Sequence, residues 1–391
     1  MTTRVLCAPD KLRGALDAAA AAAALAAGAR AAGATAVELP IADGGEGTLD
    51  AFLAGASVVS VPVRDALGRP REARLARIDG GGPREEALAG RDGSNTREAA
   101  LAGRDGDGSG ARATAGTWLV EAAEAVPLHG LAADERDVLR ASSWGVGQLI
   151  VAALDRGAAR LLVAVGGTAT MDGGAGMLAA LGASCAHNGA GLLTDQSVRL
   201  AGLDPRLREV EVELLVDVAA PLTGPDGAAR RFGPQKGATA AQVEALDAAH
   251  GRWAAALGID PATPGAGAAG GLGAALQALG ARTVAGAEAI LDLKRFDALL
   301  ADADLVLTAE GSVDASTLQG KAVAAVVGRC ARAGVPVVVL GGRVEEAAAA
   351  ELRRRGARDV RPLGPAGRPL AEALAAAASE LEAAARAAVD A

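Results

Sequence analysis

The sequence predicts an α/β protein in which a Rossmann-like, doubly wound domain is built from both chain ends and a second α/β domain is inserted in the middle. Strand, helix and strand follow one another at the start of the chain and again near its end, a pattern typical of parallel sheets. The chain has 391 residues, whereas single cores stop growing at roughly 250–300 residues. We place the discontinuous domain at 1–61 and 291–391, and the inserted domain at 62–290.

The first domain takes its elements from both chain ends. At the N-terminus the sequence predicts a strand, a helix, a strand and the start of another helix, at Arg4–Ala8, 15–33, Val37–Ile41 and Thr48–Leu53. Near the C-terminus it predicts a strand, a helix, a strand and two further helices, at Asp304–Thr308, Lys321–Ala333, Val335–Leu340, Ala347–Arg355 and 370–390.

The middle of the chain begins with a predicted hairpin. Its two alternating runs, Ser57–Val63 and Glu72–Ile78, are joined through a Leu-Gly turn, and Pro62 confines the first run to a sheet edge. Strands at Leu161–Val165 and Val210–Val218 and helices at 239–257 and 286–301 follow.

An internal duplication interrupts this domain. Residues 84–93 recur almost unchanged at 97–106, between glycine-rich flanks. A solenoid needs at least about three repeats, so we interpret 80–110 as a flexible surface loop that carries a tandem duplication. A lid over the cleft is the alternative.

Charge and cysteine usage exclude several classes of protein. A net charge of −8 argues against a nucleic-acid partner, for which a basic face is expected. Three widely spaced cysteines lack metal-ligand spacing and are typical of reduced thiols in the cytosol. No signal peptide is apparent, and the alanine run at 18–27 is too short and too weakly apolar to span a membrane. We expect a cytoplasmic protein without membrane partners; a homodimer stays open.

Five glycine-rich segments carry the functional signal, and four of them contain a carboxylate or a lysine. They are Ala42–Thr48, Gly166–Gly176, Phe232–Gly237, Pro264–Gly271 and Glu310–Asp314, the last running on to Lys321. Glycine lets the backbone approach a ligand and point its N–H groups at an anion. Carboxylates there would repel a phosphate unless a cation such as Mg²⁺ lies between them. The pattern therefore indicates phosphoryl transfer.

Each segment also has a purely structural interpretation. Asp43 could cap the helix that follows it, although Glu46 then exceeds what capping needs. The loop at Gly166 could be a tight strand-to-helix turn, and Asp217 an ordinary solvated strand end. Gly265 and Gly267 match a dinucleotide-binding pattern, but no strand precedes them. Lys321 could be a surface helix residue.

Seven segments in order resemble the glycerate kinase family of bacterial glyoxylate and glucarate breakdown. They are Ala8–Asp10, Ala42–Thr48, Gly166–Gly176, Pro221–Pro225, Phe232–Ala238, Pro264–Gly271 and Glu310–Lys321. The resemblance covers almost the whole chain. It implies ATP- and Mg²⁺-dependent phosphorylation of D-glycerate, usually to 2-phosphoglycerate, in a cleft between the two domains.

Combined with this resemblance, the residues predict a site. The predicted catalytic residues are Asp172, Asp217, Lys321, Arg13, Asp43 and Glu46, of which Asp172 and Asp217 would bind Mg²⁺ or the acceptor hydroxyl. The predicted ATP-binding residues are Gly166, Gly167, Thr168, Thr170, Gly173, Gly265, Gly267, Glu310 and Asp314. Lys321 and Arg13 would balance the phosphates or the glycerate carboxylate.

Three rival functions stay open. The protein could phosphorylate another small hydroxy acid, or it could be a dehydrogenase. It could also be a catalytically weak, nucleotide-binding regulatory protein, because Met171 and Ala220 stand where family members often carry asparagine.

Overall fold

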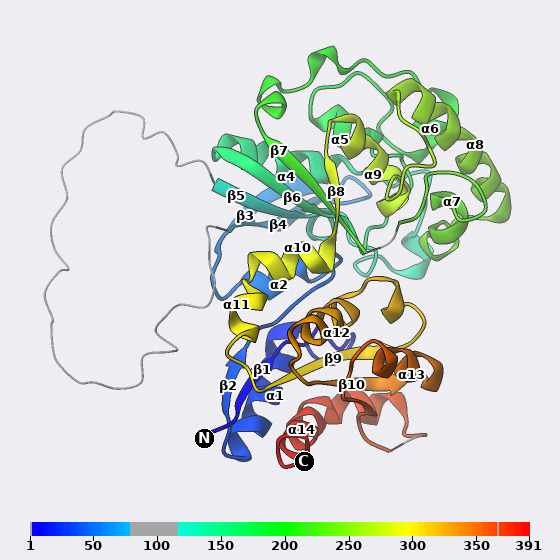
Figure 1. Cartoon of the computed structure of the whole chain (residues 1–391). Coiled ribbons are helices and arrows are strands. Elements are labelled where there is room, and N and C mark those ends of the chain that lie inside the picture. The colour runs from blue at the N-terminus through cyan, green and yellow to red at the C-terminus, as the bar shows by residue number, and fades with distance from the viewer. Residues whose placement is uncertain (1, 79–115, 218, 366) are drawn as a thin grey trace, which may run out of the picture.

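The computed structural model describes residues 2–78, 116–217, 219–365 and 367–391, and it contains two β-sheets in two lobes (Figure 1). Both termini lie in the lobe of the five-stranded sheet. The predicted α/β class is therefore confirmed. The duplicated loop at 80–110 lies outside the described residues.

The first sheet has the strand order β11-β10-β9-β1-β2, and all its described pairs are parallel. Its strands are β1 Arg4–Cys7, β2 Thr35–Glu38, β9 Leu305–Val313, β10 Val337–Val344 and β11 Asp359–Pro362. From β1 the chain moves to β2 on one side, and from β9 it moves to β10 and β11 on the other. This reversal of direction between β1 and β9 is the mark of a doubly wound sheet.

Alternation along β1 explains why helices cover both faces of this sheet. Val5 and Cys7 pack with α1 Ala18–Ala31 and α14 Leu370–Val389, whereas Leu6 packs with α12 Ala322–Ala333 and α13 Glu346–Arg354. Successive side chains of a strand point to opposite faces, so an apolar run without alternation predicts a strand covered on both sides.

The second sheet is mixed, with the order β3-β4-β5-β6-β7-β8. Its strands are β3 Ser57–Arg64, β4 Pro70–Arg77, β5 Gly116–Glu121, β6 Ala158–Ala164, β7 Glu211–Val216 and β8 Arg282–Ala285. The predicted hairpin is confirmed as β3 and β4, with β3 and its Pro62 at the edge. Because β3 starts at Ser57, residues 57–61 belong to this sheet and not to the first. The domain boundaries themselves stay predictions.

Helices also cover both faces of the second sheet. One face carries the largest core cluster, with residues of α4, α5, α8 and α9, and the other packs on α2 and α10, which lie between the two sheets in Figure 1. The α-helices of this part are α2 Thr48–Phe52, α3 Ala122–Ala125, α4 Trp144–Asp155, α5 Ala175–Ala180, α6 Gly189–Thr194, α7 Ala228–Phe232, α8 Ala240–Leu257, α9 Ala268–Ala278, α10 Gly286–Leu293 and α11 Phe296–Leu300. Short 3₁₀ turns occur at Ala133–Glu135, Leu200–Gly202, Pro205–Arg208, Pro234–Lys236 and Thr317–Gln319.

Two predicted elements are wrong in extent. The segment from Glu310 is not a loop, because β9 continues to Val313 through pairing with β10, including Gly341 opposite Glu310. The predicted helix 286–301 is two helices, since Arg295 adopts a left-handed backbone with φ 54° between them. In the described part of the chain, no helix combines the length and apolar character needed to cross a membrane.

Candidate active site

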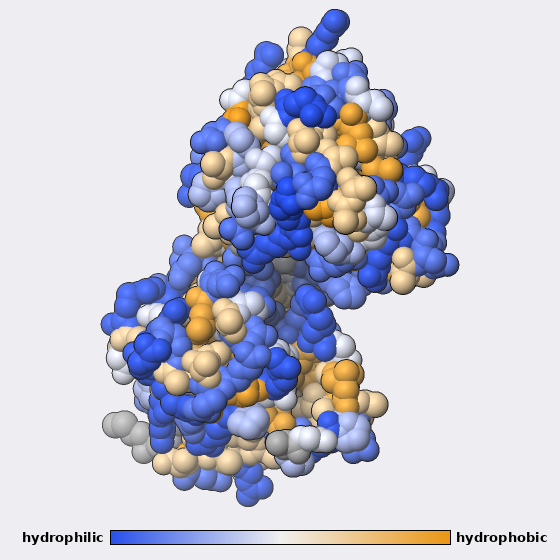
Figure 2. All heavy atoms as spheres, turned by 90° about the vertical axis from the view of Figure 1, so that its right-hand side faces the viewer, coloured by the Kyte–Doolittle hydropathy of each residue, from blue (hydrophilic) through white to orange (hydrophobic). Residues whose placement is uncertain are grey.

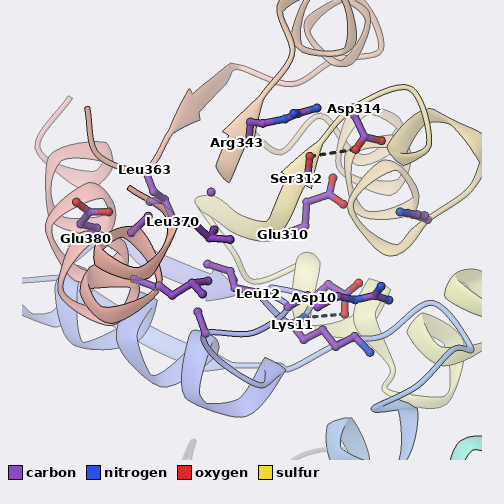
Figure 3. A pocket seen from close by; sticks show the side chains of 18 of the residues that line it. Asp10, Lys11, Leu12, Glu310, Ser312, Asp314, Arg343, Leu363, Leu370 and Glu380 are labelled. Atoms are coloured by element: carbon purple, nitrogen blue, oxygen red, sulfur yellow. Dashed lines mark hydrogen bonds between the residues drawn. The ribbon is translucent and has the colours of Figure 1, made fainter. Parts of the chain in front are cut away.

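The site begins where the parallel strands of the first sheet end. Asp10 follows β1, and Glu310 lies near the end of β9, at the point where the chain winds away in opposite directions. Ligands of open α/β sheets bind in the crevice at such a point. The side chains of Asp10 and Glu310 border the same space in Figure 3.

A cavity of about 420 Å³ occupies this crevice. One half is charged and is lined by Asp10, Lys11, Arg13, Asp43, Glu310, Asp314 and Lys321. The other half is apolar and is formed mainly by Leu12, Leu363, Leu370 and Leu374, close to α14 (Figure 3). The cavity therefore suits a ligand with one apolar end and one charged end.

Three carboxylates in the charged half repel one another. Burial raises the pKa of Glu310 to about 7, and Asp43 adds to this effect, although a 2.7 Å hydrogen bond from Thr317 Oγ1 opposes it. Burial also raises the pKa of Asp10, as do the charges of Asp43 and Glu310. Such a group of carboxylates favours a cation nearby.

Lys321 stands at the entrance of α12 beside this cavity. Its Nζ donates to Ser316 Oγ at 2.8 Å, and Ser316 Oγ donates in turn to Asp314 Oδ1 at 2.5 Å. The hydrogen bonds from Ser316 lower the pKa of Asp314. Asp314 is thus an ionised partner that holds the lysine through one hydroxyl. Arg13 is exposed at the rim of the cavity.

The ends of β6 and β7 in the second sheet form a smaller cavity of about 170 Å³. It is lined by Gly166, Gly167 and Thr168 after β6, by Asp217 after β7, and by residues that include Phe232, Gln235, Lys236, Ala268 and Ala269. Burial and then the charge of Asp43 raise the pKa of Asp217, while Lys321 and Arg231 lower it. Asp43 and Lys321, which line the larger cavity, are therefore close enough to act on Asp217. The space-filling view shows a recess between the two lobes, with hydrophilic residues on both sides (Figure 2).

The loop Asp43–Gly47 contributes Asp43 to the larger cavity and meets, at Gly45, the Gly166 loop that lines the smaller one. Asp43 Oδ1 accepts from the backbone N–H of Gly45 at 3.0 Å and does not cap α2. Instead, both carboxylate oxygens of Glu121, at the end of β5, accept N–H groups of the α2 entrance, from Gly47 and Leu49 at 2.8 Å each. Glu121 thus fixes the loop and leaves Asp43 available to the cavity.

Glu46 belongs to the same loop, and its side chain lies beside Gly167. Its Oε2 is 3.0 Å from His129 Nδ1, and its backbone carbonyl accepts from Lys11 Nζ. It lines a third cavity of about 370 Å³ together with Lys11, Arg13 and His129. Arg13 and Lys11 border both this cavity and the larger one.

Asp172 lies away from these cavities. Its side chain is fully buried and accepts four hydrogen bonds, from Ser143 N–H, Ser143 Oγ, Gly174 N–H and Gly176 N–H at 2.7–3.1 Å. Both oxygens are therefore occupied by the loop that Asp172 itself ties to α4. The structure gives this carboxylate a structural role, and its metal and catalytic roles stay predictions.

We expect Asp172→Asn to lower the free energy of unfolding by about 2–4 kcal/mol, because the amide replaces one acceptor oxygen by an NH2 donor that faces buried donors. Denaturant unfolding followed by circular dichroism measures this loss. Asp134→Asn, at an exposed position, is the control and should unfold as the wild type does. Equal stability of the two variants would contradict the structural role.

Four residues that were predicted to bind ATP, Thr170, Gly173, Gly265 and Gly267, pack within the protein and hold the loops in place. Thr170 is fully buried, the carbonyl of Gly173 accepts from Trp253 Nε1 at 2.9 Å, and Gly267 N–H donates to Ala220 O at 3.0 Å. A Cβ on Gly265 would meet Thr283 and Val216. None of these four lines the small cavity, where Ala268 and Ala269 stand instead.

Met171 and Ala220, the two residues that made a catalytically weak protein an alternative, do not line the large or the small cavity. The side chain of Met171 is fully buried in a core cluster with Val138 and Leu222, and Ala220 is 2 % exposed. An asparagine at either position would lie in the interior of this structure, and not among the cavity-lining groups.

Sequence reasoning assigned no site role to Asp10, Glu121 or Lys236. Asp10 directly follows the first predicted strand, so its place at a strand end is a signal that was available. Lys236 lies in one of the glycine-rich segments, but its burial cannot be read from sequence. Glu121 gave no local signal, because its partners are more than 70 residues away.

The carboxylates of the larger cavity fit a magnesium ion. Among the described residues, no three acidic, histidine or cysteine side chains are arranged to hold a metal by themselves. Magnesium usually takes one or two carboxylates, and phosphate and water oxygens complete its shell. Asp10, Asp43 and Glu310 offer that hard-oxygen set, and their mutual repulsion is relieved by a cation.

Two α/β lobes with charged strand ends beside a common recess fit a small-molecule kinase, and the comparisons with known proteins show this class. A family model described as the glycerate kinase family matches residues 5–391, and the chain belongs to this family.

Named relatives match most of the chain, and a solved structure shares its fold. The chain is 37% identical to the glycerate kinase of Bacillus subtilis, with 87% of this chain and 85% of that protein covered. It is 35% identical to the glycerate 2-kinase of Escherichia coli, with 88% and 86% covered. A crystal structure from Salmonella typhimurium, provisionally assigned as glycerate kinase 2, superposes with a TM-score of 0.76 at 34% identity and covers 100% of this chain and 98% of that one.

Proposed function

We propose that this protein is an ATP-dependent kinase that phosphorylates D-glycerate, with 2-phospho-D-glycerate as its product. Besides the family, one observation carries the proposal: Asp43 lines the large cavity, and its loop meets, at Gly45, the Gly166 loop that lines the small cavity. Two substrates of unequal size that exchange one group need such an arrangement.

The larger cavity suits ATP. Its leucine-lined half offers apolar contact for a purine, and Lys321, Arg13 and Lys11 offer positive charge for the phosphates. Asp10 and Glu310, with Asp43 beside them, would hold Mg²⁺. When bound, the ion supplies charge neutralisation between these carboxylates and the phosphates.

The chain's own residues then position and deprotonate the acceptor. Phosphoryl transfer passes through a loose transition state and depends more on alignment and charge than on covalent help. The acceptor hydroxyl oxygen attacks the terminal phosphorus, the bond to the leaving ADP oxygen breaks, and the hydroxyl proton passes to Asp217. Lys321, near both Asp217 and Glu310, offsets the charge that develops during transfer.

The test combines turnover with product identity. Purified protein should release ADP from Mg-ATP with D-glycerate, at a higher kcat/KM than with L-glycerate, D-lactate or glycolate. Phosphorus NMR separates the products, because a phosphate on C2 couples to one carbon-bound proton and a phosphate on C3 to two. Preference for another hydroxy acid, or ATP binding without turnover, would overturn the proposal. The predicted cytoplasmic location and a homodimer stay predictions.

A further inference from the structure

Lys236 is a buried cation without a counter-charge. It ends the 3₁₀ turn Pro234–Lys236 and is 3 % exposed. Its Nζ donates to the carbonyl of Thr170 at 2.9 Å and lies 3.5 Å from Thr168 Oγ1. An ammonium has three donors, so one is left over. In the described part of the chain, no carboxylate forms an ion pair with it.

The surroundings of Lys236 do not neutralise it. Asp172 favours its charged form, but that carboxylate is taken up by four other donors. His250 is neutral, because burial lowers its pKa to about 4. Burial likewise lowers the pKa of Lys236 to about 7. A charged group in the interior is costly unless it is paired.

The second buried lysine shows how such a charge is otherwise managed. Lys294 is 8 % exposed, donates to the carbonyl of Ala51 and places Nζ 4.6 Å from the ring centre of Phe52. It lines neither the large nor the small cavity. Lys236, by contrast, lines the small cavity together with Thr168 and Asp217.

The small cavity has the size and the chemistry for a short organic acid. Its volume of about 170 Å³, against about 420 Å³ for its neighbour, is below the range of about 300–1,000 Å³ that drug-sized ligands occupy. Its lining includes the amine of Lys236, the hydroxyl of Thr168 and the carboxylate of Asp217. A molecule that carries both a carboxylate and a hydroxyl can pair with these groups.

We propose that Lys236 is the counter-ion of the acceptor's carboxylate, so that the small cavity selects short hydroxy acids and turns their hydroxyl towards Asp217; this rests on the proposed function. The transferred phosphoryl group is the other anion that could reach Lys236, and the experiments below separate the two.

The first experiment compares two lysine variants. Lys236→Met keeps the chain length and removes the charge, and should raise the KM for D-glycerate about 10- to 100-fold with the KM for ATP unchanged. Lys294→Met is the matched control and should keep both KM values. An unchanged KM for D-glycerate in Lys236→Met would overturn the inference. So would a loss confined to kcat and the KM for ATP, which would assign Lys236 to the phosphoryl group.

The second experiment needs no turnover and no methionine variant. A bound carboxylate raises the pKa of the Lys236 ammonium. At a pH above the pKa that Lys236 has without ligand, binding should therefore take up a proton. Calorimetry of the wild type with D-glycerate and ADP at pH 8, in two buffers of different ionisation enthalpy, should show this uptake. Lys236→Arg, which stays charged, should bind without it. Wild-type binding without proton uptake, or no binding of D-glycerate or of the other short acids, would overturn the inference.

The two proposals fail in different ways. If D-glycerate binds with proton uptake but no ADP is released, the proposed kinase function is wrong and the proposed carboxylate site is supported. If the wild type releases ADP and Lys236→Met has an unchanged KM for D-glycerate, the kinase function is supported and the carboxylate site is wrong.

Discussion

Asp217→Asn is expected to lower kcat by about a hundredfold or more, since general-base catalysis contributes about that much. Asp217 follows β7 at the small cavity and is the carboxylate there that responds to Asp43 and Lys321 of the large one. An amide of the same shape can still accept a hydrogen bond but cannot take the acceptor's proton. The KM for ATP should stay close to its wild-type value.

The pH profile gives this prediction a second readout. Burial and Asp43 raise the pKa of Asp217 above the usual aspartate value of about 3.9. Because the base must be ionised, kcat should fall as the pH drops through this raised pKa, and be fully developed above it. The residual activity of Asp217→Asn should lack that acid limb.

A control variant keeps the result specific. Asp226→Asn changes an exposed carboxylate on the loop that follows and should retain wild-type kinetics. If Asp217→Asn turns over at a near-normal rate, Asp217 is not the base, whatever its position.

Strand ends were predictable because they follow a general rule of parallel sheets. Asp217 and Glu310 were picked out because each stands at or just beyond a predicted strand, and the structure places both beside cavities. Asp172 follows β6 in the same way, yet it points into the interior. What turns it inwards is Ser143, 29 residues earlier in the chain, and no local pattern encodes that partner.

Long-range packing also explains the other differences between the sequence predictions and the structure. β9 extends past Glu310 only because β10 continues beside it. Lys236 lies in one of the glycine-rich segments, but its burial under the loop of Thr168 and Thr170 is a tertiary contact that the segment does not encode. Composition and spacing therefore predict which edge of a sheet carries the site, whereas tertiary contacts determine which side chains reach it.

Gly166→Ala is expected to reduce kcat/KM by about a hundredfold, because misplacement by about 1 Å can cost that much. A Cβ at this position would lie 2.5 Å from the Cα of Gly45, which is closer than real Cβ atoms approach, and the atom it meets is backbone. The loops that carry Asp43 and Thr168 would have to separate. One loop contributes Asp43 to the large cavity and the other contributes Thr168 to the small one, so we expect both substrates to lose alignment together.

The same substitution should also lower the free energy of unfolding by about 1–3 kcal/mol, as one inserted methyl group usually does. Gly251→Ala is the control, since Gly251 lies inside α8 and a Cβ there would meet only Thr223 at 3.9 Å. It should keep full activity and gain slightly in stability, as alanine favours helices over glycine by about 1 kcal/mol. Kinetics and denaturant unfolding of both variants measure the effect. If Gly166→Ala keeps wild-type kinetics, the loops tolerate separation, and close contact between the lobes is not what aligns the substrates.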